Sequence, residues 1–285
     1  MKLLTSQSVP QWLVHNQYII TAYRPPNPSF RYCLVTAFRM HNETGNILTH
    51  LLAFLMFGIL YIYTLQCRKY KNFQTIDELM FGQYFMATFA CFTMSTLFHI
   101  FQCHSPKAFK LFAKLDYCGI TILITSSNIA WIYYGFYESL IHKFIYTFIT
   151  LLLCIIGITF SLMDSFSNGE LQVLRGAVFI MKGLFGIVPF VHFCHNLRVD
   201  TDSTISSQII FKALLLLPVM AVLYITGAIL YMAKIPERYA PGVFDLWFHS
   251  HQLFHVCTIA AGLIYFYSLS TIANARLNYN IRNVI

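Results

Sequence analysis

Two histidines four residues apart, His251 and His255, are the clearest candidates for metal chemistry in the sequence. In an α-helix this spacing places both imidazoles on one face, one turn apart, where they can share a metal ion. The pair alone is weak evidence, because histidines near the end of an apolar helix also hydrogen bond to water or to the backbone. A metal site needs further ligands at the same depth.

Two more side chains complete the candidate site. His99 ends a long apolar segment, and Asp116 opens the next one. Three neutral imidazoles suit Zn²⁺, and three protein ligands leave the fourth position open to water, as in catalytic rather than structural zinc sites. We therefore predict Zn²⁺ bound by His99, His251 and His255, with His50 on the same side.

Asp116 and Ser95 are the predicted catalytic residues. Bound Zn²⁺ lowers the pKa of water to about 7, and a carboxylate beside that water can accept its proton and return it to a leaving group. Ser95 lies one helical turn before His99, so its hydroxyl can bond to the water or to a substrate carbonyl. The alternative for Ser95 is a hydrogen bond to its own helix backbone.

The composition indicates which elements must position these residues. Hydrophobic residues make up 57% of the 285 residues and charged residues only 11%, whereas soluble domains carry about 25% charged residues. Much of the outer surface must therefore meet lipid. The net charge of +8 lies mostly in short segments between apolar runs, which suits anionic lipid headgroups. We expect no nucleic-acid partner, no disulfide framework and no signal peptide in residues 1–46.

Seven runs are long enough to cross a bilayer, which takes about 20 mainly apolar residues. They predict an all-α membrane protein, a seven-transmembrane helix bundle over residues 47–273. A cytoplasmic arm (1–46) precedes the bundle, with a short interfacial helix expected around FRMHNETGN (38–46), and a short non-cytoplasmic tail (274–285) follows. The runs cover residues 47–66, 79–101, 115–135, 144–162, 174–194, 209–232 and 247–273.

The order of the crossings places the candidate site. Each span reverses direction, so the end of the second span and the starts of the third and seventh share the face that bears the N-terminus. His99, Asp116, His251 and His255 therefore meet at one depth. Lys and Arg are slightly more frequent on that side, which favours a cytoplasmic N-terminus and a C-terminus on the opposite side.

Other histidines are expected to play smaller parts. His192 and His195 end the fifth span on the opposite face, where His142 also lies. They leave a second metal site open, although histidines at a helix end are usually interfacial. The remaining histidines are expected to be interfacial or solvated: His249, His104, His15 and His41.

Two cations fall within the predicted fifth span. Arg175 and Lys182 are seven residues apart, so they lie on roughly one stripe of a helix. They either face a polar cavity or pair with an acid such as Asp164. A plainer account has Arg175 reaching the membrane edge, which leaves Lys182 as the unusual residue.

Several segments resemble one family, the progestin and adipoQ receptors, which are adiponectin receptor-like and related to haemolysin III. The resemblance covers residues 39–273, and its motifs occur in the family's order. They are HNETGNILTH (41–50), Ser95 with Phe98, His99 and His104, KLDYCGI (114–120) and PERYAPGVFDLWFHSHQLFH (236–255).

The resemblance implies seven transmembrane helices with a cytoplasmic N-terminus. It also implies zinc held by His99, His251 and His255, with Asp116 near the zinc water. The family is similar to intramembrane hydrolases that include alkaline ceramidases. Its adiponectin-receptor members are associated with hydrolysis of the ceramide amide to sphingosine and fatty acid.

Two departures from the family bear on the ligand. The N-terminal region is short, and QYIITAYRP followed by HNETGNILTH resembles the family's member four more than its adipokine-binding branch. Progestin-binding members often carry an extra span and altered histidine motifs, whereas the histidine set is complete here. Neither adiponectin nor a progestin is therefore expected as the ligand.

The leading hypothesis is an intramembrane zinc hydrolase that cleaves the amide of ceramide-like lipids. Its partners would be membrane lipids, a ceramide-like substrate and free fatty acid. The alternative is a lipid or hormone receptor with a structural zinc and little turnover. A transporter is less favoured, because polar groups gather at one face rather than at the midplane. The expected location is the plasma membrane, the Golgi or the endoplasmic reticulum.

Overall fold

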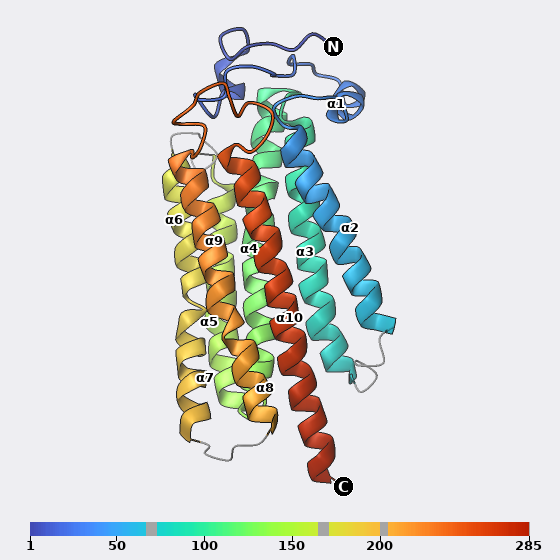
Figure 1. Cartoon of the computed structure of the whole chain (residues 1–285), viewed down its shortest axis with the longest axis vertical. Coiled ribbons are helices and arrows are strands. Elements are labelled where there is room, and N and C mark those ends of the chain that lie inside the picture. The colour runs from blue at the N-terminus through green and yellow to red at the C-terminus, as the bar shows by residue number, and fades with distance from the viewer. Residues whose placement is uncertain (67–72, 165–170, 200–204, 285) are drawn as a thin grey trace.

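A computed structural model describes residues 1–66, 73–164, 171–199 and 205–284, and these residues form long helices and no β-strand. The helices lie side by side in one elongated bundle, with the N-terminal arm folded over one end and the C-terminus at the other (Figure 1). The long helices are α2 (Thr44–Gln66), α3 (Thr75–Phe101), α4 (Pro106–Gly135), α5 (Leu140–Leu162), α6 (Gln172–Leu184), α7 (Ile187–Val199), α8 (Ile205–Leu214), α9 (Leu216–Ala233) and α10 (Ser250–Val284).

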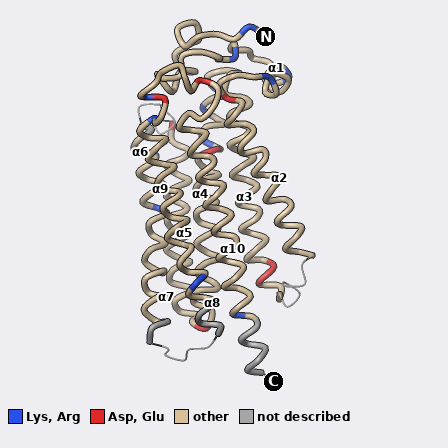
Figure 2. The backbone as a smooth tube through the Cα atoms, viewed as in Figure 1, with Lys and Arg blue, Asp and Glu red and all other residues tan. Residues whose placement is uncertain are grey.

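Six stretches within the described residues are long and apolar enough to cross a membrane. Four of them are α2, α3, α5 and α10; the other two join α6 to α7 (Val173–Asn196) and α8 to α9 (Ile209–Ala233). The remaining predicted span, α4, runs among these helices but carries buried hydroxyls at Thr121, Thr125 and Ser126. Figure 2 shows most charged residues toward the two ends of the bundle.

Helix α4 begins nine residues before its predicted start, so part of the segment taken for a loop is helical. Ser105 is the N-cap, and its Oγ accepts a hydrogen bond from the backbone N–H of Ala108 at 3.2 Å. Pro106 occupies the first turn, where its missing N–H costs nothing. The Ser105-Pro106 pair therefore marks the start of this helix in the sequence. The predicted loops around residues 67–72, 165–170 and 200–204 fall on positions outside the described residues.

Both ends of the chain also differ from the sequence prediction. The short helix of the arm is α1 (Phe30–Ala37), not the following FRMHNETGN segment, and Ser29 caps it by accepting from the N–H of Tyr32 at 3.3 Å. The predicted tail beyond residue 273 continues the last helix, because α10 runs to Val284.

The fifth and sixth predicted spans are each divided into two helices. Pro189 lies four residues after Phe185, and Pro218 lies four residues after Leu214. A proline has no N–H to donate to the carbonyl four residues earlier, and its ring crowds that carbonyl. The α6–α7 and α8–α9 divisions follow directly from these two prolines.

A cap closes the end of the bundle that holds the candidate site. We define the cap as the arm (residues 1–43) together with the α9–α10 loop (residues 234–249). Asp245 of the loop accepts hydrogen bonds from the backbone N–H groups of Ile20 and Thr21 at 2.9 and 2.7 Å. Asn16 donates its side-chain amide to Glu237 at 2.9 Å. The two parts of the cap therefore hold each other.

The arm is also fixed to the bundle beneath it. The guanidinium of Arg24, which is 2% exposed, donates to the carbonyl oxygens of His99 at 2.6 Å and of Cys33 at 3.2 Å. The sulfurs of Cys33 and Cys103 lie 3.7 Å apart in the same contact, and both cysteines are free. These bonds hold the arm directly over the end of α3.

Candidate metal centre and its cavity

Three imidazoles meet beneath the cap. His99 comes from the last turn of α3, and His251 and His255 come from the first turns of α10. One ligand nitrogen of each lies within 4.8 Å of a ligand nitrogen of the other two. Among the described residues, these three side chains form a group that could hold a metal ion. The ring centroids are 4.8–5.2 Å apart, with interplanar angles of 69–89°. The alternating direction of the predicted spans placed these three histidines at the same face.

The protonation of His99 is set by a buried carboxylate. Nδ1 of His99 lies 2.8 Å from Oε2 of Glu43. An ionised carboxylate only accepts, so Nδ1 carries the proton and Nε2 presents its lone pair. Nε2 is buried and has no hydrogen-bond partner among the described residues. Glu43 therefore fixes the ring of His99 in the tautomer that a metal ligand needs.

His255 is oriented in a similar way by a hydroxyl. Thr49 donates its single proton to the carbonyl oxygen of Asn46 at 3.0 Å. Its oxygen also lies 2.9 Å from Nδ1 of His255, and with its proton committed it can only accept there. Nδ1 of His255 is then the protonated nitrogen, which leaves Nε2 free to bind a metal.

Glu43 is held in turn by its own neighbours. Asn46 donates its side-chain amide to Oε2 at 2.6 Å, and the backbone N–H of Glu43 donates to Nδ1 of His41 at 3.0 Å. Burial alone raises the pKa of Glu43, but the hydrogen bond from His99 holds it well below its usual value. Burial and the charge of Arg24 lower the pKa of His41 to about 3, so its ring is neutral and can accept.

Sequence reasoning assigned no role to Glu43 and expected His41 to be solvated. The second expectation is wrong, because His41 is completely buried. The available signal was an acid placed directly before an apolar span, between two motif residues that the family resemblance had already marked.

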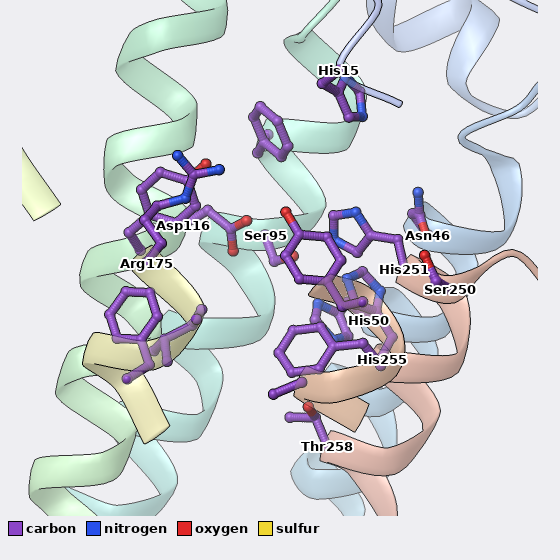
Figure 3. Close-up of a pocket in the computed structure, with 18 of the residues that line it drawn as sticks. His15, Asn46, His50, Ser95, Asp116, Arg175, Ser250, His251, His255 and Thr258 are labelled. Atoms are coloured by element: carbon purple, nitrogen blue, oxygen red, sulfur yellow. The ribbon is translucent and has the colours of Figure 1, made fainter. Parts of the chain in front are cut away.

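Asp116 and Ser95 lie beside the three histidines without joining them. Asp116 extends from α4 toward Ser95 of α3 and the space in front of the imidazoles (Figure 3). The hydroxyl of Ser95 is buried, and it interacts with the carboxylate of Asp116 rather than with its own helix. By contrast, the hydroxyl of Thr96 donates to the carbonyl of Phe92 at 2.7 Å. Ser95 and Asp116 therefore face each other beside the imidazoles.

A cavity of about 740 Å³ connects this site to the middle of the bundle. Near the cap it is lined by Trp12, His15 and His251, and farther along by Ser95 and Asp116. Apart from the polar Ser127 and Asn128, its far part is lined mainly by apolar side chains: Leu123, Ile124, Leu184, Ile187, Met220 and Ile225. The volume suits a sizeable organic ligand, polar at one end and apolar at the other.

The two cations predicted in the fifth span have different surroundings. Arg175 lines the cavity and stacks its guanidinium over the ring of Tyr117 at 4.7 Å. Lys182 is buried and donates to the carbonyl of Thr121 and the hydroxyl of Thr125, both at 2.9 Å. The suggested partner Asp164 instead binds Lys114 at 2.5 Å. The cavity alternative therefore holds for Arg175.

Comparison with known proteins identifies the family. The sequence profile described as haemolysin-III related matches residues 38–266. The chain belongs to the haemolysin-III-related family. It is 40% identical to the adiponectin receptor protein of Drosophila melanogaster, covering 98% of this chain and 61% of that protein. It is 34% identical to the ADIPOR-like receptor IZH2 of Saccharomyces cerevisiae, covering 92% and 81%.

A third relative, the progestin and adipoQ receptor-like protein 1 of Caenorhabditis elegans, is 39% identical over 97% of this chain. The chain spans about three fifths of the length of the fly and worm relatives. With six candidate spans and this family membership, the haemolysin-III-related chain is a multi-pass integral membrane protein. The likeness of its arm to the family's member four stays a prediction.

The other histidines of this family member are less solvated than the sequence suggested. His249 is buried, and its Nε2 lies 3.3 Å from the carbonyl oxygen of Asn42. His104 stacks on Phe30 with ring centroids 4.1 Å apart. His50 stacks on His255 at 3.5 Å, which packs the back of that ligand. The cap covers His249 and His104 by folding back on the bundle, which periodicity along the chain does not reveal.

Proposed function

We propose that the chain is a seven-span membrane protein with a cytoplasmic N-terminus that hydrolyses the amide of ceramide-like lipids, using Zn²⁺ held by His99, His251 and His255. The observation that carries the proposal is the juxtaposition of three imidazoles with a non-ligand carboxylate, Asp116, in a cavity with an apolar end. Two of the imidazoles have neighbours that leave Nε2 free, so the donor set fits zinc.

Bound zinc would supply a Lewis acid for the amide carbonyl and a lower pKa for water. Asp116 would accept a proton from that water and return it to the amide nitrogen as the C–N bond breaks. The hydroxyl of Ser95 would donate a hydrogen bond to the carbonyl oxygen. Arg175 and Tyr231 line the same part of the cavity and would bind the polar head of the lipid.

The apolar part of the cavity suits an acyl chain. Leu123, Leu184, Ile187 and Met220 offer no hydrogen-bonding groups, so burying methylene groups against them is favourable, by about 0.8 kcal/mol for each. A lipid bound with its chain there would place its amide beside Ser95 and Asp116, at the polar end.

Helix α4 is the seventh span of this proposal. Its 30 residues exceed the length needed to cross. Its hydroxyls at Thr121 and Thr125 point into the protein, where both residues accept hydrogen bonds from Lys182. A helix that is shielded by its neighbours tolerates hydroxyls that a lipid-facing helix would avoid.

A receptor role is the alternative, because several relatives are called receptors. Zinc would then brace α3 against α10, and lipid or another ligand would bind without being cleaved. The two functions differ in what Asp116 must do: only the hydrolase needs its proton chemistry.

The test combines fatty-acid release from ceramide with zinc content. We expect Asp116→Asn to lower turnover at least about 100-fold, as loss of a general acid–base does, while zinc content is retained. Asp164→Asn, an exposed aspartate outside the cavity, is the control and should keep parental turnover. A zinc-loaded parent that releases no fatty acid, or an Asp116→Asn variant as active as the parent, would contradict the hydrolase.

A further inference from the structure

A second pair of imidazoles lies at the end of the bundle opposite the cap. His142 stands in the first turn of α5 and His192 in α7, and these helix ends lie together at that end (Figure 1). The two ring centroids are 4.7 Å apart and the ring planes are inclined by 84°. Both side chains are half-buried, so solvent reaches the pair.

The ring geometry matches that of the candidate metal centre. There the three imidazole pairs have centroids 4.8–5.2 Å apart and planes inclined by 69–89°. Two imidazoles that bind one ion through nitrogens about 2.0–2.1 Å from it must come this close. The separation and inclination of His142 and His192 therefore fit a ligand pair, although edge-to-face packing such as that of Tyr133 and Tyr134 gives similar values.

The hydrogen bonds of both rings leave the same nitrogen free. Nδ1 of His142 lies 2.7 Å from the hydroxyl of Ser139, and Nδ1 of His192 lies 2.8 Å from the hydroxyl of Tyr146. When these oxygens accept from Nδ1–H, as Thr49 does at His255, each Nε2 presents a lone pair. Neither ring makes another hydrogen bond within the described residues.

A third imidazole is within one helical turn. His195 follows His192 at the i+3 position of α7 and is exposed. An exposed side chain changes rotamer freely, so it can turn toward an ion held by the other two. Imidazole is a good ligand for Zn²⁺, Cu²⁺ and Ni²⁺, and water can fill the remaining position.

We propose that His142 and His192, assisted by His195, form a second site for a divalent, imidazole-binding metal, independent of the proposed hydrolase. The nearby cation Lys143 is engaged elsewhere, with its ammonium 3.0 Å from the carbonyl of Tyr137 and over the rings of Tyr133 and Tyr137. Such a metal would link α5 to α7, two lipid-exposed helices that otherwise meet here through rings and one hydroxyl. The partly exposed pair suits an exchangeable ion rather than a permanent one.

Zinc titration of the purified chain tests the second site. Protein dialysed against metal-free buffer is titrated with Zn²⁺ alone, and bound zinc is measured by mass spectrometry alongside the melting temperature. We expect the parent to take up one further zinc with a rise in melting temperature. His192→Gln and His142→Gln should lose this uptake, and His195→Gln should weaken it. His104→Gln, a half-buried histidine under the cap, is the matched control and should behave as the parent.

The zinc that each variant retains through dialysis reports on the candidate metal centre under the cap, and so shows whether that end of the bundle is folded. His251→Ala should lose that retained zinc yet still take up the exchangeable one, which separates this proposal from the proposed function. A parent that binds no further zinc, or a His142→Gln/His192→Gln double variant that still does, would overturn the second site. If the double variant aggregates, the single variants serve instead. Zinc uptake unchanged both in His195→Gln and in either His142→Gln or His192→Gln would overturn the second site.

Discussion

The inner and outer helices of the bundle are built differently. About 67% of the apolar stretch of α3 and 56% of that of α10 are buried, against 17% for α5, for α6 with α7, and for α8 with α9. The inner helices carry the three imidazoles, whereas Arg175 of α6 and Tyr231 of α9 form the outer wall of the cavity. The metal ligands thus stand on the well-packed helices, and the ligand cavity is bounded by helices that face lipid.

The difference follows from what each part must do. Metal ligands need fixed positions, which dense packing and hydrogen bonds supply. A cavity wall needs an apolar surface on both sides, one toward the ligand and one toward lipid. The prolines at positions 189 and 218 interrupt the outer helices, and no proline interrupts the inner α3 or α10.

The largest effect is expected from removing packing in the inner helices. Phe85 of α3 is completely buried, whereas Phe148 of α5 is 60% exposed. We expect Phe85→Ala to destabilise the fold by about 3–5 kcal/mol and Phe148→Ala by about 0.5 kcal/mol or less, measured by denaturant unfolding in detergent. Equal losses at both positions would remove the distinction between inner and outer helices.

The next effect concerns the groups that orient the ligands. Glu43→Gln removes the negative charge that holds the proton on Nδ1 of His99. We expect zinc affinity to fall about 10- to 100-fold, as for other lost partners of metal-bound histidines. Competition with a chelator measures this change. Glu78→Gln, at an exposed position of α3, is the control; an unchanged affinity in Glu43→Gln would show that Glu43 does not set the state of His99.

A smaller effect is expected from narrowing the outer wall. Gly183 of α6 lines the cavity, and a Cβ built there meets no atom within 4 Å. Gly183→Leu should therefore fold and occupy cavity space, lowering release of long-chain fatty acid by about tenfold without loss of zinc. Gly58→Leu on α2 also enters open space but outside the cavity. If both substitutions changed release equally, the cavity would not be the acyl site.

The smallest effect is expected at the surface ion pair of Lys114 with Asp164. The hydrogen bond and charge of Lys114 lower the pKa of Asp164. A lowered pKa stabilises the folded state above the unfolded pKa, and this stabilisation is lost as pH falls through the folded pKa. Because Asp164 is 80% exposed, solvent screens the pair. Lys114→Gln should melt with the parent at neutral and acid pH; a clear difference at neutral pH would show that this end is more rigid than its exposure suggests.

Much of the fold could be predicted from the sequence, because hydrophobic run length and the alternation of crossings are local properties. Together they brought His99, Asp116 and the α10 histidines to one face. The Ser-Pro start of α4 and the prolines that divide the outer spans were also readable. The breaks at the two prolines were missed because an apolar run hides a break in the helix within it, and the start of α4 was missed because its first turns carry several lysines.

The rest depends on contacts between distant segments. The burial of His41 and His249 and the bonds of Arg24 and Asp245 arise because the arm folds over the α9–α10 loop. Hydrophobic periodicity along the chain does not predict such a cap. Glu43 and His99 are 56 residues apart in the sequence, and only the packing of α2 against α3 brings them together.

The zinc content of the purified chain tests the central claim most directly. Protein purified with zinc present and then dialysed against metal-free buffer is analysed by mass spectrometry, as parent and as His99→Ala. We predict one retained zinc per parent chain and none in the variant, with both eluting as folded protein. A folded parent that retains no zinc, or a His99→Ala variant that retains as much as the parent, would contradict the metal centre on which the proposed function rests.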